Sequence, residues 1–598
     1  MNSSPFKDEG WLFGLAFLIA LGFRLLQLGA TPLTDSEATL ALQALQVAQG
    51  KAPLLGSQTA YILFTSILFA IINATNFMAR LIPAIAGSAL VFAPYFFREK
   101  IKPRPALILA FLIAIDPGLV ALSRQASGTM LSVTFLLFAW GMWRMRRAIP
   151  AGIFAGLALL SGPSLWAGLL VLGLTWLFIQ GMGSRSTPET TEEQSATLAS
   201  DAGADLSTSR FSNFQFSNLE LRPALLAILV TLLFGSTLFF LSPNGLSAWL
   251  SALPDYLRGW TAPSSMSSGR VLRAFLAYEP LGIFLAVLSL LRGFRIKGRR
   301  ILRLGLWLGV ALLLAIFYRQ ASELVWVIIP LLTLAALELS RALNIFAEER
   351  VEVGVVVLAL MILLVYIWFD VSKIGLDPIS NLAATSLPLF GRTVQLAAAS
   401  YMVLLGAFLI IILCVSFVAF GWSARTAWLG TTWAFVICLG IYSFAAAWGA
   451  SGMRFPNGVE LWSADPAPAQ PELLLASVDD VSEFSLGHDT SQPVTVMGID
   501  SAALEWVLRD RPVELVSTLD PQVAPPIVIT PLMKDLGLPA AYRGQDFIWR
   551  QTPRWQEIKN PDWIRWLVFR QLPHDDETII LWVRDDLFPD AREASQQP

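Results

Sequence analysis

The sequence predicts an α-helical polytopic membrane protein of about thirteen transmembrane helices with a C-terminal extracytoplasmic α/β domain. Of the 598 residues, 55% are hydrophobic and only 14% are charged, whereas soluble domains carry about 25% charged residues. Apolar stretches of roughly 18 residues or more recur along the chain. Near residue 450 the composition changes to that of a soluble domain. These observations predict a membrane domain at 1–449 and a second domain at 450–598.

The membrane domain begins with an apolar stretch at 11–30. No small-residue cleavage site follows it, so we interpret it as a retained transmembrane helix and not as a signal peptide. The remaining transmembrane helices are predicted at 77–97, 106–122, 130–143, twice within 151–180, 224–241, 274–291, 305–318, 324–339, 354–369, 395–420 and 427–448.

Lys and Arg residues cluster in alternate connections, at 98–104, 144–147 and 292–303. By the positive-inside rule these connections face the cytoplasm. The N-terminus is then cytoplasmic, and the first outer loop (31–76) and the C-terminal domain are extracytoplasmic. The expected location is the plasma membrane.

Two further segments of the membrane domain are not predicted to cross the bilayer. Residues 61–74 are apolar but only about fourteen long, too short to cross comfortably, so a juxtamembrane helix on the outer surface is expected. Residues 181–219 are rich in Ser, Thr and acids and lack periodicity, which is typical of a disordered insertion, here on the cytoplasmic side.

The C-terminal domain alternates strand-like and helix-like segments. Strands are predicted at 494–498, 513–519, 525–531 and 579–584, and a helix at 501–510. The segment 542–573 interleaves Arg with Trp, which suits stacking on sugar rings or contact with lipid head groups. The alternative is an aromatic core containing Trp549, Trp555, Trp563 and Trp566.

Cysteine and histidine usage restricts the chemistry. Cys414 and Cys438 lie in apolar stretches, and His488 and His574 both lie in the last quarter of the chain. Ser–His triads and His-ligated zinc are therefore excluded from the membrane domain. Acid–base chemistry there depends on Asp or Glu.

The stretch TPLTDSEATLALQALQVAQGK (31–51) places two acids just after the first transmembrane helix. Thr34 and Glu37 fit a capping box, in which the two side chains satisfy free backbone donors at the start of a helix. Capping does not explain why Asp35 and Glu37 stand at the first exit from the membrane. Both interpretations stay open at this point.

The order of motifs carries a resemblance. A helix containing Arg24 is followed by PLTDSEATLALQALQVAQGKAP, a surface apolar helix, NFMARLIPAIAGSALVFAPYFF, a basic loop and ALILAFLIAIDPGLVALSRQASGTM. This order resembles the N-terminal half of GT-C-fold glycosyltransferases, in particular the family-39 and protein O-mannosyltransferase-like group, which includes the lipid A aminoarabinose transferases. The resemblance covers roughly the first 180 residues in motifs and the later helices in topology only.

The resemblance implies transfer of a sugar from a polyprenyl-phosphate donor to a protein, lipid or glycan acceptor on the outer face. It implies Glu37 and Asp35 as catalytic acids. The phosphate leaves without a proton, so one carboxylate base and cations for the phosphate form the minimum set. Arg124, which follows the third transmembrane helix, is the first candidate to bind the donor phosphate. Arg319 is the second.

Arg80 is a further candidate for the phosphate, although for Arg24 and Arg80 extension toward lipid head groups is preferred. The sequence departs from the group in two places. The acidic pair is Asp35-Ser36-Glu37, with one residue inserted, and the second acid expected four or five residues after Ser123-Arg124 is replaced by Gly128 and Thr129.

No metal ligands are predicted; no cofactor is certain, and a divalent cation is left open. Nucleic acid is not an expected partner.

The outer loop at 242–273 is expected either to cover the donor as a lid or to anchor at the membrane interface. Two other functions compete with glycosyl transfer: a transporter of lipid-linked sugars, and a non-catalytic envelope scaffold that retains the fold.

Overall fold

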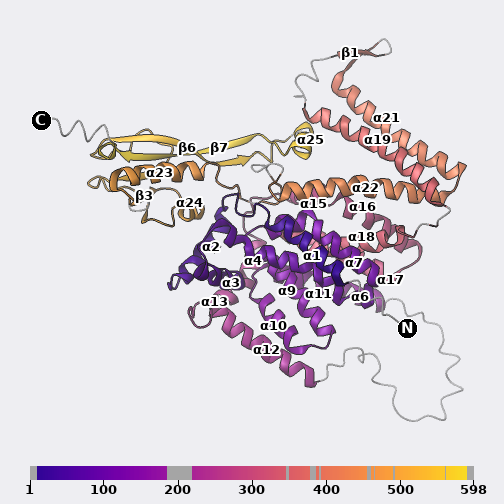
Figure 1. The fold of residues 1–598 in the computed structure, drawn as a ribbon, viewed down its shortest axis with the longest axis horizontal. Helices are drawn as coiled ribbons and strands as arrows, with labels where there is room; N and C mark the ends of the chain where they lie inside the picture. Colours follow the sequence, from indigo (N-terminus) through magenta and orange to yellow (C-terminus); the bar gives the residue numbers. More distant parts are fainter. Residues whose placement is uncertain are drawn as a thin grey trace.

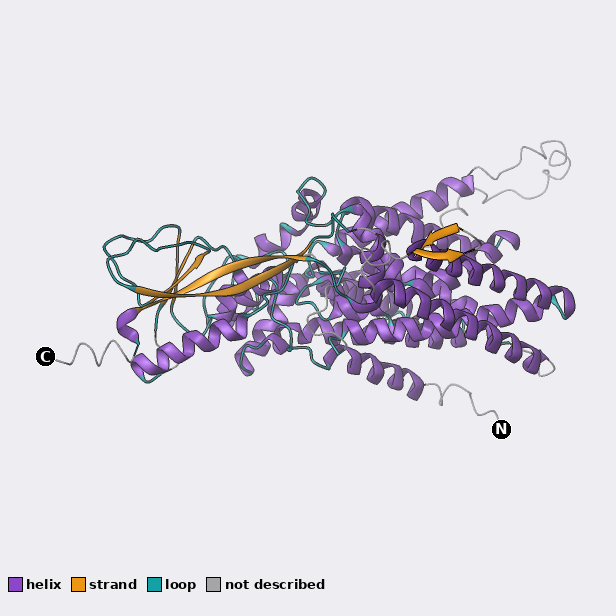
Figure 2. Cartoon of the chain, turned by 90° about the horizontal axis from the view of Figure 1, so that it is seen from above, coloured by secondary structure: helices purple, strands orange, loops and turns teal. Residues whose placement is uncertain are grey.

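The computed structural model describes residues 10–184, 218–344, 346, 349–376, 386–389, 392–453, 460–463, 465–488, 492–558 and 560–588. A helical domain and a smaller sheet-containing domain make up the described chain (Figures 1 and 2). Most of the insertion expected at 181–219 lies outside the described residues.

The helical domain extends through α22 and includes two short strands, β1 and β2. Its elements in chain order are α1 (Gly10–Leu25), α2 (Asp35–Ala48), α3 (Thr59–Ile71), α4 (Asn76–Ala89), η1 (Leu90–Phe92), α5 (Ala93–Phe96), α6 (Arg98–Ile101), α7 (Pro103–Ile115), α8 (Pro117–Ser123), α9 (Thr129–Arg144), α10 (Ala148–Leu159), α11 (Ser164–Ser184), α12 (Asn218–Ser236), α13 (Gly245–Leu250), α14 (Ala252–Gly259), α15 (Ser268–Tyr278), α16 (Pro280–Arg295), α17 (Arg299–Tyr318), η3 (Ala321–Leu324), α18 (Val325–Ala342), α19 (Arg350–Leu376), β1 (Ser386–Leu389), β2 (Arg392–Gln395), α21 (Leu396–Gly421) and α22 (Ala424–Ala450).

Seven helical segments among the described residues are long and apolar enough to cross a membrane, or nine if each of two bent pairs is one span. Four shorter apolar helices accompany them. The helical membrane architecture is confirmed, and the count of about thirteen spans stays a prediction.

Both bent pairs break at an acidic residue that precedes a proline. The α7–α8 pair bends by 56° at Asp116, and the α15–α16 pair bends by 86° at Glu279. A proline disfavours helical geometry in the residue before it, so Pro117 and Pro280 end the preceding helices. Asp116 then caps the new helix by accepting a hydrogen bond from the backbone N–H of Leu119 at 2.7 Å.

The short helix expected at 61–74 is α3. One face is buried, and the Tyr61 hydroxyl on that face donates to the carbonyl of Ala79 in α4 at 2.8 Å. Its position on the membrane surface stays a prediction.

The C-terminal domain is a five-stranded sheet of order β4-β3-β5-β7-β6 with helices beside it. β3 pairs in parallel with β4 and β5, while β7 pairs antiparallel with β5 and β6. The elements are α23 (Pro471–Leu486), β3 (Val494–Met497), α24 (Ala502–Val507), β4 (Val513–Val516), β5 (Ile527–Pro531), β6 (Tyr542–Pro553), α25 (Asn560–Phe569), β7 (His574–Arg584) and η5 (Asp585–Leu587). The four predicted strands and the helix at 501–510 are present, whereas β6, α23 and α25 were not predicted.

The two domains share their hydrophobic cores. Leu33, Tyr61 and Phe69 of the first loop are buried in one cluster with the interior of the sheet. There the rings of Phe69 and Trp506 are 5.8 Å apart. In Figure 1, α2 lies beside α24 accordingly. The first loop therefore packs as part of the C-terminal domain.

The Arg- and Trp-rich segment 542–573 forms β6 and α25. Trp549 and Trp566 are almost completely buried, as the aromatic-core alternative expects. Trp555 and Trp563 are half-buried and lie against arginines of α15: Arg270 is 4.5 Å from the Trp555 ring centre. These contacts fasten α25 to the helical domain.

Candidate functional site

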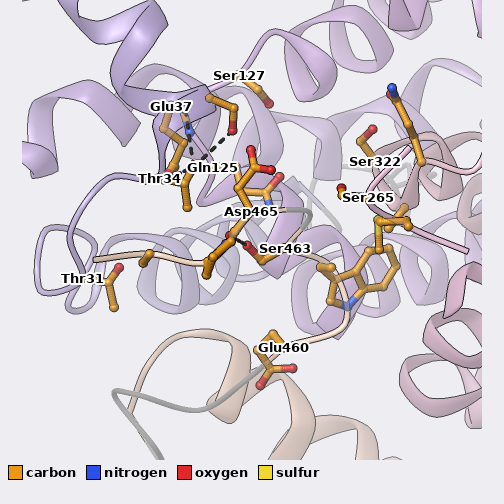
Figure 3. A pocket seen from close by; sticks show the side chains of 18 of the residues that line it. Thr31, Thr34, Glu37, Gln125, Ser127, Ser265, Ser322, Glu460, Ser463 and Asp465 are labelled. Atoms are coloured by element: carbon orange, nitrogen blue, oxygen red, sulfur yellow. Dashed lines mark hydrogen bonds between the residues drawn. The ribbon is translucent and has the colours of Figure 1, made fainter. Parts of the chain in front are cut away.

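A cavity of about 1390 Å³ lies where the helical domain meets the C-terminal domain (Figure 3). It is lined by residues within 28–40, 124–129, 161–164, 259–270, 319–323, 460–473 and 551–557. Glu37, Arg80, Arg124 and Arg319 all line it. The structure thus brings four of the five predicted site residues to one cavity.

Glu37 lies at one end of the cavity, in the first turn of α2. Thr34 and Glu37 form the predicted capping box. One Glu37 oxygen accepts from Arg80 Nε at 2.9 Å and from the backbone N–H of Ala126 at 2.8 Å, and the other accepts from Arg80 Nη2 at 2.6 Å. The side chain is only 8% exposed. This carboxylate therefore joins α2, α4 and the turn that follows α8.

The surroundings of Glu37 keep it ionised. Burial alone would raise the pKa of Glu37, but the charge and hydrogen bonds of Arg80 and the backbone donors of Ala126 and Thr34 together place the pKa below its usual value. A carboxylate stabilised in this way holds a negative charge firmly and accepts a proton poorly.

Arg80 uses all its nitrogens within the protein. Besides the two bonds to Glu37, Nη1 donates to the carbonyls of Leu28 and Thr31, and Nη2 donates to that of Pro32. Arg80 thereby fixes the chain between α1 and α2.

Arg124 follows the last residue of α8 and caps the C-terminal end of α1. Its guanidinium donates to the carbonyls of Phe23, Arg24, Leu26 and Gln27 at 2.7–3.3 Å. These carbonyls lack partners within the helix, and a cation at a helix C-terminus also interacts favourably with the dipole.

The prediction that Arg24 and Arg80 extend toward lipid head groups is wrong. Arg24 is fully buried and donates to the carbonyls of Ile113 and Ala114, where α7 breaks. Arg80 is 5% exposed and forms the contacts given above. Broken helices and loop carbonyls offered acceptors inside the protein that the sequence did not reveal.

Arg319 differs from these arginines. It ends α17 in the left-handed conformation, with φ of 60°, and its carbonyl accepts from Ser264 at 2.9 Å. Its guanidinium makes no hydrogen bond or ion pair with the residues that the structure describes. Among the three predicted phosphate-binding residues, Arg319 therefore has its donors free for a ligand.

Asp35 does not line the cavity. One of its oxygens accepts from the Ser501 hydroxyl at 2.6 Å and from the Ala503 N–H at 3.0 Å, at the start of α24. The other pairs with Arg550 of β6. The structure thus places this predicted catalytic acid in the contact between α2 and the C-terminal domain.

Several lining residues were not predicted. Glu323 accepts from the Ser164 hydroxyl at 3.0 Å, and Glu460 accepts from the Tyr278 hydroxyl and pairs with Arg570 at 3.5 Å. Burial raises the pKa of Glu460, although the Arg570 charge opposes the shift. Asp465 also lines the cavity. Glu323 closely follows the predicted Arg319 in FYRQASE, whereas Asp465 lies in the Pro- and Ala-rich stretch ADPAPAQP, which gives no signal for a site.

No three or more His, Cys, Asp or Glu side chains gather to hold a metal ion anywhere in the described ranges.

No protein-family model matches the sequence, and no curated protein matches it. Solved structures do match: the crystal structure of ArnT from Cupriavidus metallidurans bound to undecaprenyl phosphate has a TM-score of 0.50 and 14% identity, over 88% of this chain and 93% of that one. The apo state of the same protein gives a TM-score of 0.49 over the same shares, again at 14% identity. ArnT is an aminoarabinose transferase with the GT-C fold. The GT-C-like fold expected from the sequence is therefore confirmed.

Proposed function

We propose that this protein is a membrane glycosyltransferase that moves a sugar from a polyprenyl-phosphate donor to an acceptor on the outer face of the plasma membrane. The cavity at the domain junction carries the proposal, because it combines a free guanidinium with carboxylates inside a GT-C fold. The ArnT structure with undecaprenyl phosphate supports a donor of this lipid class.

The reaction needs two kinds of group. A polyprenyl phosphate leaves with negative charge, which a positioned cation stabilises without a proton. The acceptor hydroxyl or amine loses a proton, which a carboxylate within reach can accept. The cavity supplies both kinds of side chain.

The donor phosphate is proposed to bind at Arg319, whose donors are free of partners among the described residues. Arg124 and Arg80 lie on the same cavity but already donate to the protein. We propose that these two arginines place positive charge near the phosphate and form a rigid wall of the cavity. They bond the phosphate directly only where one of their nitrogens is accessible from the cavity.

Glu37 is proposed to act as a fixed anion. Its negative charge faces the cavity and stabilises the positive charge that develops on the sugar ring in an oxocarbenium-like transition state. Asp35 is proposed to support catalysis indirectly, by holding the C-terminal domain over the cavity.

The test uses the purified full-length protein in nanodiscs with undecaprenyl phosphates that carry radiolabelled hexoses or pentoses. We expect transfer of label to envelope acceptors or release of free sugar by hydrolysis. Arg319→Ala should weaken binding of undecaprenyl phosphate, whereas Arg258→Ala, at an exposed position of α14, should not. A wild-type protein that binds donors but never cleaves them would favour transport or a scaffold role and contradict the proposal.

A further inference from the structure

We propose that Asp465, on the segment that joins the two domains, is the catalytic base that takes the proton from the acceptor. This inference rests on the proposed function and deepens it. It assigns a second functional acid to a chain whose sequence has Gly128 and Thr129 where an acid was expected after Ser123-Arg124.

The connecting segment is anchored on the side of the helical domain. Trp462 is 3% exposed, packs in the core of the membrane helices and lies 5.0 Å from the Tyr278 ring. The carbonyl of Ser463 accepts from Arg270 at 2.5 Å, and its hydroxyl donates to the carbonyl of Asp465 at 2.5 Å. The backbone of Asp465 is thus held from α15.

The segment is also anchored on the side of the sheet. Pro468 forms a β-bridge with Arg550 of β6, and the N–H of Ala469 donates to the carbonyl of Trp549 at 2.8 Å. Helix α23 then begins at Pro471. Anchors on both sides hold Asp465 in place over the cavity, and such positioning is what proton transfer in a site requires.

The carboxylate itself is available. Asp465 is half-buried, lines the cavity, and projects into it in Figure 3. Its side chain forms no hydrogen bond or ion pair with the described part of the chain. Arg270 is close enough to interact electrostatically.

The other carboxylates of the cavity are occupied or exposed. Glu37 accepts from Arg80 and two backbone donors, Glu323 accepts from a serine, and Glu460 is bonded to Tyr278 and Arg570. Asp575 and Glu557 pair with Arg554. Glu472 has no partner in the described ranges but is exposed at the first turn of α23. Asp465 is therefore the lining acid that is both half-buried and unpaired among the described residues.

In the proposed step, the acceptor oxygen forms a bond to the anomeric carbon of the sugar while the bond from that carbon to the phosphate oxygen breaks. The departing polyprenyl phosphate takes the electron pair and gains one negative charge. Asp465 takes the acceptor proton and loses one negative charge, so charge and protons balance. The proton is then released to water, which restores the carboxylate.

The test uses the full-length protein, a radiolabelled undecaprenyl-phosphate sugar and water as the acceptor. Asp465→Asn should lower the hydrolysis rate by about 10²–10⁴-fold and leave binding of undecaprenyl phosphate unchanged. Asp480→Asn, at an exposed position of α23, is the matched control. Added formate should partly restore the rate of Asp465→Ala, because a small carboxylate replaces the missing base.

The outcomes separate the two proposals. If the wild-type protein hydrolyses the donor and Asp465→Asn does so equally fast, Asp465 is not the base and the proposed function stands. If Glu472→Gln but not Asp465→Asn abolishes hydrolysis, the exposed acid has the role instead. If the wild-type protein cleaves no donor, the proposed function is contradicted and the assignment of Asp465 falls with it.

Discussion

Glu37 illustrates how one buried side chain can organise several segments. Its two oxygens connect a helix start, an arginine from α4 and a turn from 124–129. Removing one member of a buried ion pair leaves the other charged and without its partner. This lowers the free energy of unfolding far more than replacing both members does. The pair is therefore a strong structural element whatever its part in the reaction.

We predict that Glu37→Gln and Arg80→Met each destabilise the protein by about 3–5 kcal/mol. The double variant should cost clearly less than the sum, because neither group is then left alone. Thermal unfolding in detergent measures this, with Arg258→Met as the exposed control. Strictly additive shifts would show that the two side chains are not coupled.

The same carboxylate predicts a pH dependence. The pKa of Glu37 in the folded protein lies below its usual value of 4.5, so the ionised form stabilises the fold above that pH. This contribution is lost as the pH falls through the lowered pKa. The wild-type protein should therefore lose more thermal stability below pH 4.5 than Glu37→Gln does. Parallel pH profiles would assign the acid sensitivity to other groups.

The sequence identified Glu37 and its capping box because both depend on local spacing. It did not reveal that the side chain of Asp35, two residues earlier, contacts the C-terminal domain more than 400 residues later in the chain, because that contact depends on tertiary packing. For the same reason it found Arg319 through a motif but missed Asp465, whose position depends on how the connecting segment is anchored.

At the level of elements, the contact between α2 and α24 holds the C-terminal domain against the first loop. Asp35 acts as an acceptor for the start of α24 and as the partner of Arg550. The buried Trp506 of α24 adds a hydrogen bond from its indole N–H to Asn76 at 2.7 Å. Loss of the hydrogen bonds and the ion pair of Asp35 should weaken the contact between α2 and the C-terminal domain without unfolding either domain.

We predict that Arg550→Met and Asp35→Asn increase hydrogen exchange in 501–507 and protease cleavage in 460–473. A lost charged hydrogen bond corresponds to about 1.5–3 kcal/mol of docking free energy. Turnover should fall while binding of undecaprenyl phosphate persists, because Arg319 is not displaced. Arg543→Met, an exposed residue of the same strand β6, is the control. Unchanged exchange in both variants would contradict a docking role for Asp35.

For the whole molecule, the sequence predicted the helical membrane class and the small sheet domain because hydrophobicity and strand alternation are strong local signals. It missed β6, since YRGQDFIWRQTP mixes Gly and charged residues with aromatics and pairs with β7 through an irregular register near Ile548. Nor did it reveal the shared core of first loop and C-terminal domain, which depends on contacts between distant segments.

The orientation in the membrane stays a prediction with a direct test. In a variant without Cys414 and Cys438, single cysteines at Ser57 and Ser485 should react with a membrane-impermeant maleimide in intact cells. A cysteine at position 195 should react only after permeabilisation. Labelling at 195 from outside would contradict the positive-inside assignment.

The ion pair of Asp35 with Arg550 joins positions 515 residues apart in the chain. A ribosome that adds about 5–20 residues per second needs roughly 25–100 s to make that length. For most of this interval the newly inserted chain has Glu37, Arg80 and Arg124 but lacks the connecting segment and the sheet that cover them. Under the proposed function, biosynthesis imposes a delay between membrane insertion and catalytic competence, and a chain that terminates between Arg319 and residue 460 would keep the proposed phosphate site but lack Asp465.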